Sequence, residues 1–275
     1  MIELAPNHKI GLAIHSPLMP AAGFFGYGAN PYRPLIQTQQ FGALVTNPIT
    51  LRPRQPPPPP PALEVTGGVI FPAPPGNPGV KKIIRRYQKT WRKTPVPVIA
   101  HLPADDPDDL ARTAGALDSL NVLAGFELGL PRQITAIEAQ TCMRAILRRS
   151  ELPLLVRLPY PPEPELVAAV AGAGTGALVL GTAPLAAAFN PQGEYVPGDL
   201  YGPGAAARCL PALVDLRRRF PHLPLIAGGG VHSPADAQAY LQAGAIAGQF
   251  DSLIFTHPAR VQQILGRCID SPPGL

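Results

Sequence analysis

Short, almost wholly apolar runs recur along the chain, with helical stretches between them. Continuous Val, Ile and Leu character indicates strands that are covered on both faces. Eight such runs predict eight buried strands, at residues 18–22, 43–46, 98–102, 125–128, 154–158, 177–180, 225–227 and 246–250. Ahead of them, residues 2–4 and 10–14 flank a Pro-Asn-His turn, which predicts a short N-terminal hairpin.

The stretches between these runs carry helix signals. Residues 135–149 begin with Thr-Ala-Ile-Glu, a capping box in which Thr135 pairs with Glu138. Another helix opens at Ser233-Pro234, with Gly244 beyond its end. Further helices are predicted at 105–120, 163–173, 204–220 and 257–268. Eight strand–helix units predict a (β/α)8 TIM barrel that occupies 1–275 as one domain, with a doubly wound open sheet as the alternative.

One connection is much longer than the others. The loop over residues 52–79 follows the second strand and contains six consecutive prolines at 56–61. Such a run is stiff and extended, and it has no backbone donors. It is either a rigid spacer or a wall or lid over the barrel mouth.

Proline and glycine are abundant, with 38 Pro and 27 Gly among 275 residues. That composition by itself suggests disorder. The hydrophobic fraction of 46% argues for a packed core instead, because disordered chains lack the apolar surface that offsets the entropy of ordering. The prolines are therefore interpreted as stiff loops around a folded barrel.

The net charge of +5 is local rather than general. Seven of the 23 basic residues lie within 81–93, a stretch without any acid, and the rest of the chain has 16 basic against 18 acidic residues. Because Ile83, Ile84, Tyr87 and Trp91 fall at helical spacing, this stretch predicts an amphipathic outer helix. Its basic face is either simply solvated or contacts an acidic partner subunit. It does not favour nucleic-acid binding.

Cysteines are few, at Cys142, Cys209 and Cys268, without a CxxC pair. They predict neither a disulfide framework nor a local zinc site, and they suit a reducing compartment. No apolar run reaches the ~18 residues of a membrane span, and the N-terminus lacks signal-peptide features. A cytoplasmic protein without a metal is expected.

Several motifs in order along the chain carry a resemblance. The most specific is the run from Gly42 to Arg54, GALVTNPITLRPR, preceded by Met19 to Gly26 and followed by Gly-Asn-Pro-Gly-Val at 76–80. Later segments fit in register, at 154–158, 172–180, 201–203, 224–231 and 235–249. Together these motifs resemble the dihydroorotate dehydrogenase family over nearly the whole chain.

The resemblance implies an FMN-binding (β/α)8 barrel that oxidises dihydroorotate to orotate in pyrimidine synthesis. In that reaction a side chain removes a proton from C5 while hydride passes to flavin N5. Many relatives pair with themselves or with an electron-transfer subunit, so a homodimer or such a subunit is an expected partner.

Part of the family's site is retained. By resemblance, the turn at 21–23 lies along the flavin, Thr46 contacts it, Asn77 binds the orotate ring, and a threonine after the sixth strand remains. Gly229 and Gly230 match the phosphate-binding glycines after the seventh strand, although a tight turn also accounts for them. The retained cofactor-site residues are Ala21, Ala22, Gly23, Thr46, Thr182, Gly229 and Gly230.

Other family positions are changed. Where the family has a lysine that contacts flavin and substrate, this chain has Asn47. Where the family has a second lysine near the flavin's N1–O2 edge, this chain has Arg157. Gly129 stands where the family has an asparagine on the fourth strand. The loop after this strand is short and does not hold the family's catalytic Cys or Ser. The remaining departures are Gly181 for an asparagine and Asp251-Ser252 for a phosphate-binding Gly-Thr pair.

Two side chains leave alternatives open. Asp251 either faces the phosphate position, where two like charges repel, or caps the following helix. His101 is the one candidate base near a strand end, and it is otherwise a hydrogen-bonded pocket residue. Glu127 is expected to pair with a barrel arginine.

Three functions remain open from the sequence. The first is a divergent FMN-dependent oxidoreductase that acts on dihydroorotate or a related small molecule. The second is a non-catalytic paralogue that serves as a binding or partner subunit, having lost the base and the flavin lysines. The third is a barrel enzyme for another phosphorylated ligand at Gly229-Gly230.

Overall fold

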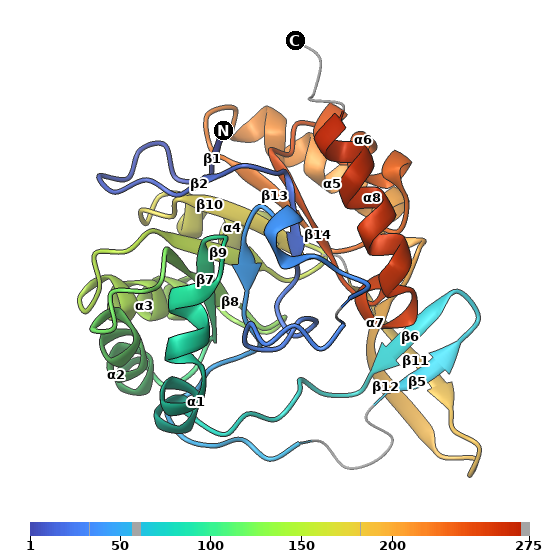
Figure 1. Cartoon of the computed structure of the whole chain (residues 1–275), viewed down its shortest axis with the longest axis horizontal. Helices are drawn as coiled ribbons and strands as arrows, with labels where there is room; N and C mark the ends of the chain where they lie inside the picture. The colour runs from blue at the N-terminus through green and yellow to red at the C-terminus, as the bar shows by residue number, and fades with distance from the viewer. Residues whose placement is uncertain (33, 57–61, 182, 271–275) are drawn as a thin grey trace.

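Eight parallel strands form a nearly closed barrel, as the apolar runs predict (Figure 1). The computed structural model describes residues 1–32, 34–56, 62–181 and 183–270. Residues 268–270 are described by their backbone alone. The barrel strands are β3 (Leu18–Pro20), β4 (Leu44–Val45), β7 (Val98–Pro103), β8 (Gly125–Gly129), β9 (Leu154–Leu158), β10 (Ala177–Gly181), β13 (Leu225–Gly228) and β14 (Ala247–Phe250). Between β3 and β4, Gly42 N donates to Leu18 O at 2.8 Å, and this contact all but closes the ring.

The predicted helices cover the outside of the barrel. The helices are α1 (Val80–Lys93), α2 (Pro107–Asp118), α3 (Ala136–Leu147), α4 (Pro164–Ala171), α5 (Ala205–Arg219), α6 (Pro234–Gln242), α7 (Leu253–Thr256) and α8 (Pro258–Asp270). The first strand is followed by a 3-10 turn, η1 (Thr38–Gln40), instead of an α-helix. The capping box of Thr135 and Glu138 is confirmed, and Ser233 caps α6.

The predicted N-terminal hairpin, β1 (Ile2–Glu3) with β2 (Ala13–Ile14), is confirmed and closes the bottom of the barrel. Leu4 and Leu12 pack there in one apolar cluster with inward residues such as Ile99 and Leu155. Side chains alternate along a strand with a period of two. The next inward positions, two residues further along each strand, are therefore those at the barrel mouth.

A four-stranded antiparallel sheet, which the sequence pattern does not predict, stands beside α7, away from the hairpin (Figure 1). Its strands, in spatial order, are β11 (Leu185–Phe189), β12 (Tyr195–Tyr201), β6 (Gly68–Phe71) and β5 (Leu63–Val65). The 52–79 segment thus carries two strands of its own. Residues 57–61 of the proline run lie outside the described residues.

The new sheet reaches the barrel through an aromatic cluster. Phe71 and Tyr201 pack edge-on against Phe24, with ring centroids 6.0 and 4.9 Å away, and Phe24 stacks on Phe255 of α7 at 5.7 Å. Phe24 follows the turn at 21–23 directly. The long loop therefore acts as a wall beside the mouth rather than as a spacer.

Candidate active site at the barrel mouth

Four inward side chains form a connected polar layer across the mouth. His101 Nδ1 lies 2.9 Å from Glu127 Oε1, and Gln249 Nε2 donates to Glu127 Oε2 at 3.1 Å. Arg157 donates from Nη1 to Gln249 Oε1 at 2.7 Å and from Nη2 to Gly228 O. Both carboxylate oxygens of Glu127 and the amide of Gln249 are thereby occupied by neighbours within the protein.

Glu127 is fully buried, yet it is held as a carboxylate. Burial is the largest single influence and opposes ionisation. The hydrogen bond and charge of His101, the charge of Arg157 and the hydrogen bond from Gln249 together outweigh burial, so the pKa of Glu127 falls below its ordinary value. The expected pairing of Glu127 with a barrel arginine is therefore indirect: Arg157 acts on Glu127 by its charge and through Gln249, and His101 makes the direct contact.

His101 fits the mouth because residue 129 has no side chain. A Cβ at Gly129 would lie 2.6 Å from His101 Cε1 and 2.8 Å from Nε2, well inside contact distance. The imidazole therefore occupies the space that a side chain at 129 would need. The ring at 101 and the missing side chain at 129 therefore depend on each other, which the sequence alone does not reveal because the two residues lie on neighbouring strands.

Thr46 and Asn47 are used to fix backbone. The Thr46 hydroxyl accepts from His101 N at 3.1 Å and donates to Asn47 O at 2.9 Å. Asn47 Oδ1 accepts from Gly26 N at 2.9 Å, while Asn47 N donates to Gly26 O at 2.8 Å. Asn47 thus holds the end of the 21–26 turn, a task that needs an acceptor.

Asn77 differs from its neighbours because half of its amide has no partner. Its Oδ1 accepts from Thr50 Oγ1 at 2.9 Å and from Gly79 N at 3.0 Å. Its Nδ2 is buried and makes no hydrogen bond to the described residues. A buried donor left unsatisfied costs about 1–3 kcal/mol, so this amide is suited to a ligand with an acceptor.

The glycine turn after β13 is occupied by a carboxylate of the protein itself. Gly230 N donates to Asp251 Oδ2 at 2.7 Å, and His232 Nε2 lies 3.0 Å from Asp251 Oδ1. Ser252 Oγ also donates to Oδ1, at 3.2 Å. Of the two alternatives for Asp251, the structure thus shows the one that faces the glycines, and Ser252 stands at the N-cap of α7 without a side-chain cap.

The short loop between β8 and α3 places an arginine across the mouth. Arg132 donates to Ala183 O at 2.9 Å and to Tyr160 O, and it pairs with Asp199 of β12. It therefore ties the ends of three barrel segments to the antiparallel sheet. Near it, burial first and then the charge of Asp199 raise the pKa of Tyr201, so that phenol stays protonated.

The other predicted site residues contribute less. A Cβ at Gly181 would lie 2.4 Å from Leu158 O, so this backbone leaves no room for a side chain there. Thr182 lies outside the described residues, as do the side chains from Cys268 onward. Burial raises the pKa of Cys142 and, to about 12, that of Cys209, so neither thiol is a ready base.

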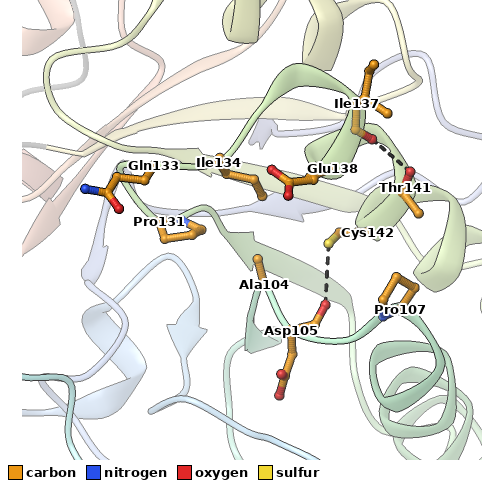
Figure 2. Close-up of a pocket in the computed structure, with 10 residues that line it drawn as sticks. All are labelled: Ala104, Asp105, Pro107, Pro131, Gln133, Ile134, Ile137, Glu138, Thr141 and Cys142. Atoms are coloured by element: carbon orange, nitrogen blue, oxygen red, sulfur yellow. Dashed lines mark hydrogen bonds between the residues drawn. The ribbon is translucent and has the colours of Figure 1, made fainter.

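A cavity of about 410 Å³ lies on the outer rim rather than in the mouth. Figure 2 shows it between the start of α3 and the loop after β7, with Ile134 and Glu138 on one side and Ala104 and Asp105 on the other. Cys142 Sγ contacts Asp105 O there at 3.7 Å. This cavity does not include any of the polar mouth residues.

The described residues contain neither a candidate metal cluster nor a candidate membrane span. No group of three or more His, Cys, Asp and Glu side chains there could hold a metal ion. Within the same part of the chain, none of the helices is long and apolar enough to cross a membrane.

Comparison with known proteins decides the family. The family model for dihydroorotate dehydrogenase matches residues 6–132. The chain is 30% identical to the dihydroorotate dehydrogenase B (NAD(+)) catalytic subunit of Desulforudis audaxviator, over 86% of this chain and 81% of that protein. The chain belongs to the dihydroorotate dehydrogenase family. Proteins of the same description from Pelobacter propionicus (29%) and Porphyromonas gingivalis (28%) match 92% and 93% of the chain and 88% of their own lengths.

Membership makes FMN the cofactor to test against the site. The resemblance implies a phosphate at Gly229-Gly230, and the buried Asp251 carboxylate already accepts from the Gly230 N–H there at 2.7 Å. Arg157, where the resemblance implies a lysine near the flavin, donates instead to Gly228 O and Gln249 Oε1. The described residues therefore do not fit FMN bound in the family manner.

Sequence reasoning missed two members of this site. Gln249 and His232 were not singled out, although Gln249 completes the polar layer and His232 contacts Asp251. For Gln249 the signal was available, since a lone polar residue in an apolar strand run faces either the barrel interior or a partner. Nothing in the sequence marks His232.

Proposed function

We propose that this chain is a flavin-independent, non-catalytic member of the dihydroorotate dehydrogenase family that works as a binding or partner subunit. The observation that carries the proposal is the hydrogen bond from Gly230 N–H to the fully buried Asp251 carboxylate. Its length of 2.7 Å is typical of a charge-assisted hydrogen bond. A phosphate at that place would meet both steric overlap and like-charge repulsion. The repulsion alone is ~4 kcal/mol at 4 Å and an effective dielectric constant of ~20.

The catalytic side supports the same proposal. The loop between β8 and α3 holds neither Cys nor Ser, and its Arg132 is committed to Tyr160 O, Ala183 O and Asp199. His101, the remaining base candidate, has Nδ1 held by Glu127 and its ring packed against Gly129. A general base must reach the proton that it abstracts, and this residue is only 7% exposed.

The surface of α1 supports a partner role. Its basic residues are exposed, and no ion pair joins them to an acid within the described part of the chain. Lys81 and Lys82 stand in the first turn, where positive charge opposes the helix dipole, and no acid balances them there. An acidic surface on a partner protein would neutralise these exposed positive charges. The relatives are named as catalytic subunits, a description that belongs to them.

The test of the proposal is the visible spectrum of the purified protein. We expect a colourless protein that also stays colourless after incubation with FMN and desalting. Flavin bands that persist, and that bleach anaerobically with dihydroorotate, would overturn the proposal and establish an oxidoreductase.

A second candidate, the divergent FMN-dependent oxidoreductase, is favoured by Asn77. Its unpartnered Nδ2 suits a ring carbonyl of dihydroorotate or a related small molecule. Thermal shift with orotate tests this directly. Stabilisation of the wild type that disappears in Asn77→Ala supports retained substrate binding, and an unchanged melting temperature in both counts against it.

A further inference from the structure

The donors around Asp251 are arranged as an anion site. Gly230 N–H, His232 Nε2 and Ser252 Oγ converge on one carboxylate from distances of 2.7, 3.0 and 3.2 Å. Asp251 is fully buried, Ser252 is 1% exposed and His232 is 8% exposed. Buried anions need such donors, because an unpaired charge in this environment is very costly.

The backbone of the turn retains the geometry of a ligand-binding glycine loop. Gly229 and Gly230 have φ values of 144° and 80°, which residues with a side chain rarely adopt. Tyr240 Oη donates to Gly229 O at 3.0 Å, and this contact fixes the turn from below. The turn thus points an N–H at an anion, and the anion is supplied by the chain itself.

The cluster is not a hydrolytic triad. Asp251 Oδ1 and Ser252 Oγ face the same His232 nitrogen, Nε2, at 3.0 and 3.4 Å. A triad needs the acid on one ring nitrogen and the nucleophile on the other. The three side chains therefore act together as a binding arrangement and cannot relay a proton to Ser252.

We infer that Asp251 is a tethered anion that stands in for a ligand phosphate, and that Gly230, His232 and Ser252 form a latent phosphate site beneath it. This inference rests on the proposed function, since it assumes that the wild type carries no FMN. A carboxylate and a phosphate both present oxygens that accept from backbone N–H and imidazole donors. Removing the carboxylate should leave these donors unsatisfied around a space that a phosphate oxygen can enter.

The decisive variant is Asp251→Gly, which vacates the space and restores the family residue. We expect it to bind inorganic phosphate at least about tenfold more tightly than the wild type, because the like charge that occupies the space is removed. Isothermal titration of phosphate, with chloride at matched ionic strength as the blank, measures the change. Asp251→Ala serves as a second vacating variant, and thermal midpoints in phosphate against chloride report rescue if either variant folds poorly.

Two control variants distinguish the effect of vacating the turn from the effect of removing a negative charge. Asp251→Asn keeps the volume and an oxygen toward Gly230 N–H, so it should gain no phosphate binding. Asp236→Asn removes a neighbouring carboxylate that accepts from His232 N at 3.0 Å and from Ser233 Oγ, without vacating the turn, and it should gain none either.

The outcomes are distinguishable. Phosphate binding or rescue in the vacated variants alone supports the tethered anion, whether or not the larger FMN also binds. A colourless wild type whose vacated variants take no phosphate overturns this inference and leaves the proposed function standing. A wild type that itself retains FMN overturns the proposed function, and the tethered anion with it.

Discussion

Replacing Glu127 by Gln tests whether the polar layer holds the mouth together. The carboxylate accepts from His101 Nδ1 at 2.9 Å and from Gln249 Nε2 at 3.1 Å, fully buried. A glutamine keeps the volume but removes the negative charge beside Arg157 and turns one acceptor into a donor, which the Gln249 amide cannot satisfy and which His101 Nδ1 satisfies only as its other tautomer. Gln249 cannot flip to compensate, because its oxygen accepts from Arg157 at 2.7 Å.

The expected cost follows from this geometry. Breaking one partner out of a buried, hydrogen-bonded charge pair costs about 3–5 kcal/mol. For a chain of this size that corresponds to a fall in melting temperature of roughly 6–20 °C. Urea unfolding followed by circular dichroism measures the free energy of unfolding directly.

The matched control is Glu151→Gln, which removes a carboxylate from an exposed pair with Lys9. Its urea midpoint should stay essentially where it is in the wild type. The double variant Glu127→Gln with Gln249→Glu should recover part of the loss, because Arg157 then faces a carboxylate. If Glu127→Gln unfolds at the same urea concentration as Glu151→Gln, the mouth layer does not have the role assigned to it.

Three further predictions follow from the same contacts. The pKa of Glu127 is lowered in the folded state, so its ionised carboxylate contributes stability above about pH 4.5. This contribution is lost as the pH falls through the folded-state pKa. The unfolding midpoint should therefore fall less with acidification in Glu127→Gln than in the wild type. Asn47→Lys introduces the residue that the resemblance implies but removes the acceptor of Gly26 N–H, and urea unfolding should show a loss of about 1–3 kcal/mol. Arg157→Lys should leave the desalted protein colourless, because Asp251 still holds Gly230; a yellow protein would place the obstacle at Arg157 instead.

The barrel could be predicted from the sequence because each of its strands has a local signal in the chain. Strands buried on both faces are continuous apolar runs, and β9 falls at the predicted residues 154–158. The capping box at Thr135 fixed the start of α3 in the same local way. These features depend on neighbours within a few residues.

The antiparallel sheet could not be predicted because its pairing is distant. β12 pairs with β6 across more than a hundred residues, and β11 reads Leu-Ala-Ala-Ala-Phe, which has no strand signature. The same limit applied at the site. The resemblance implies a glycine where this chain has Asp251, but the orientation of the Asp251 side chain depends on Gly230 and His232, which come from another strand end.

His101 is a residue whose position the sequence predicts correctly but whose role it does not. Its position at the end of a strand run was correct, and it suggested a base. The structure gives a packing reason, since Gly129 on the next strand leaves the space that the ring fills. A steric relation of this kind becomes visible only when neighbouring strands are placed side by side.

The most direct measurement of the central claim is a calorimetric titration of FMN into the wild-type protein beside Asp251→Gly. The account predicts no saturable heat for the wild type, because its own carboxylate occupies the Gly230 N–H. Saturable, stoichiometric binding of FMN to the wild type would contradict it.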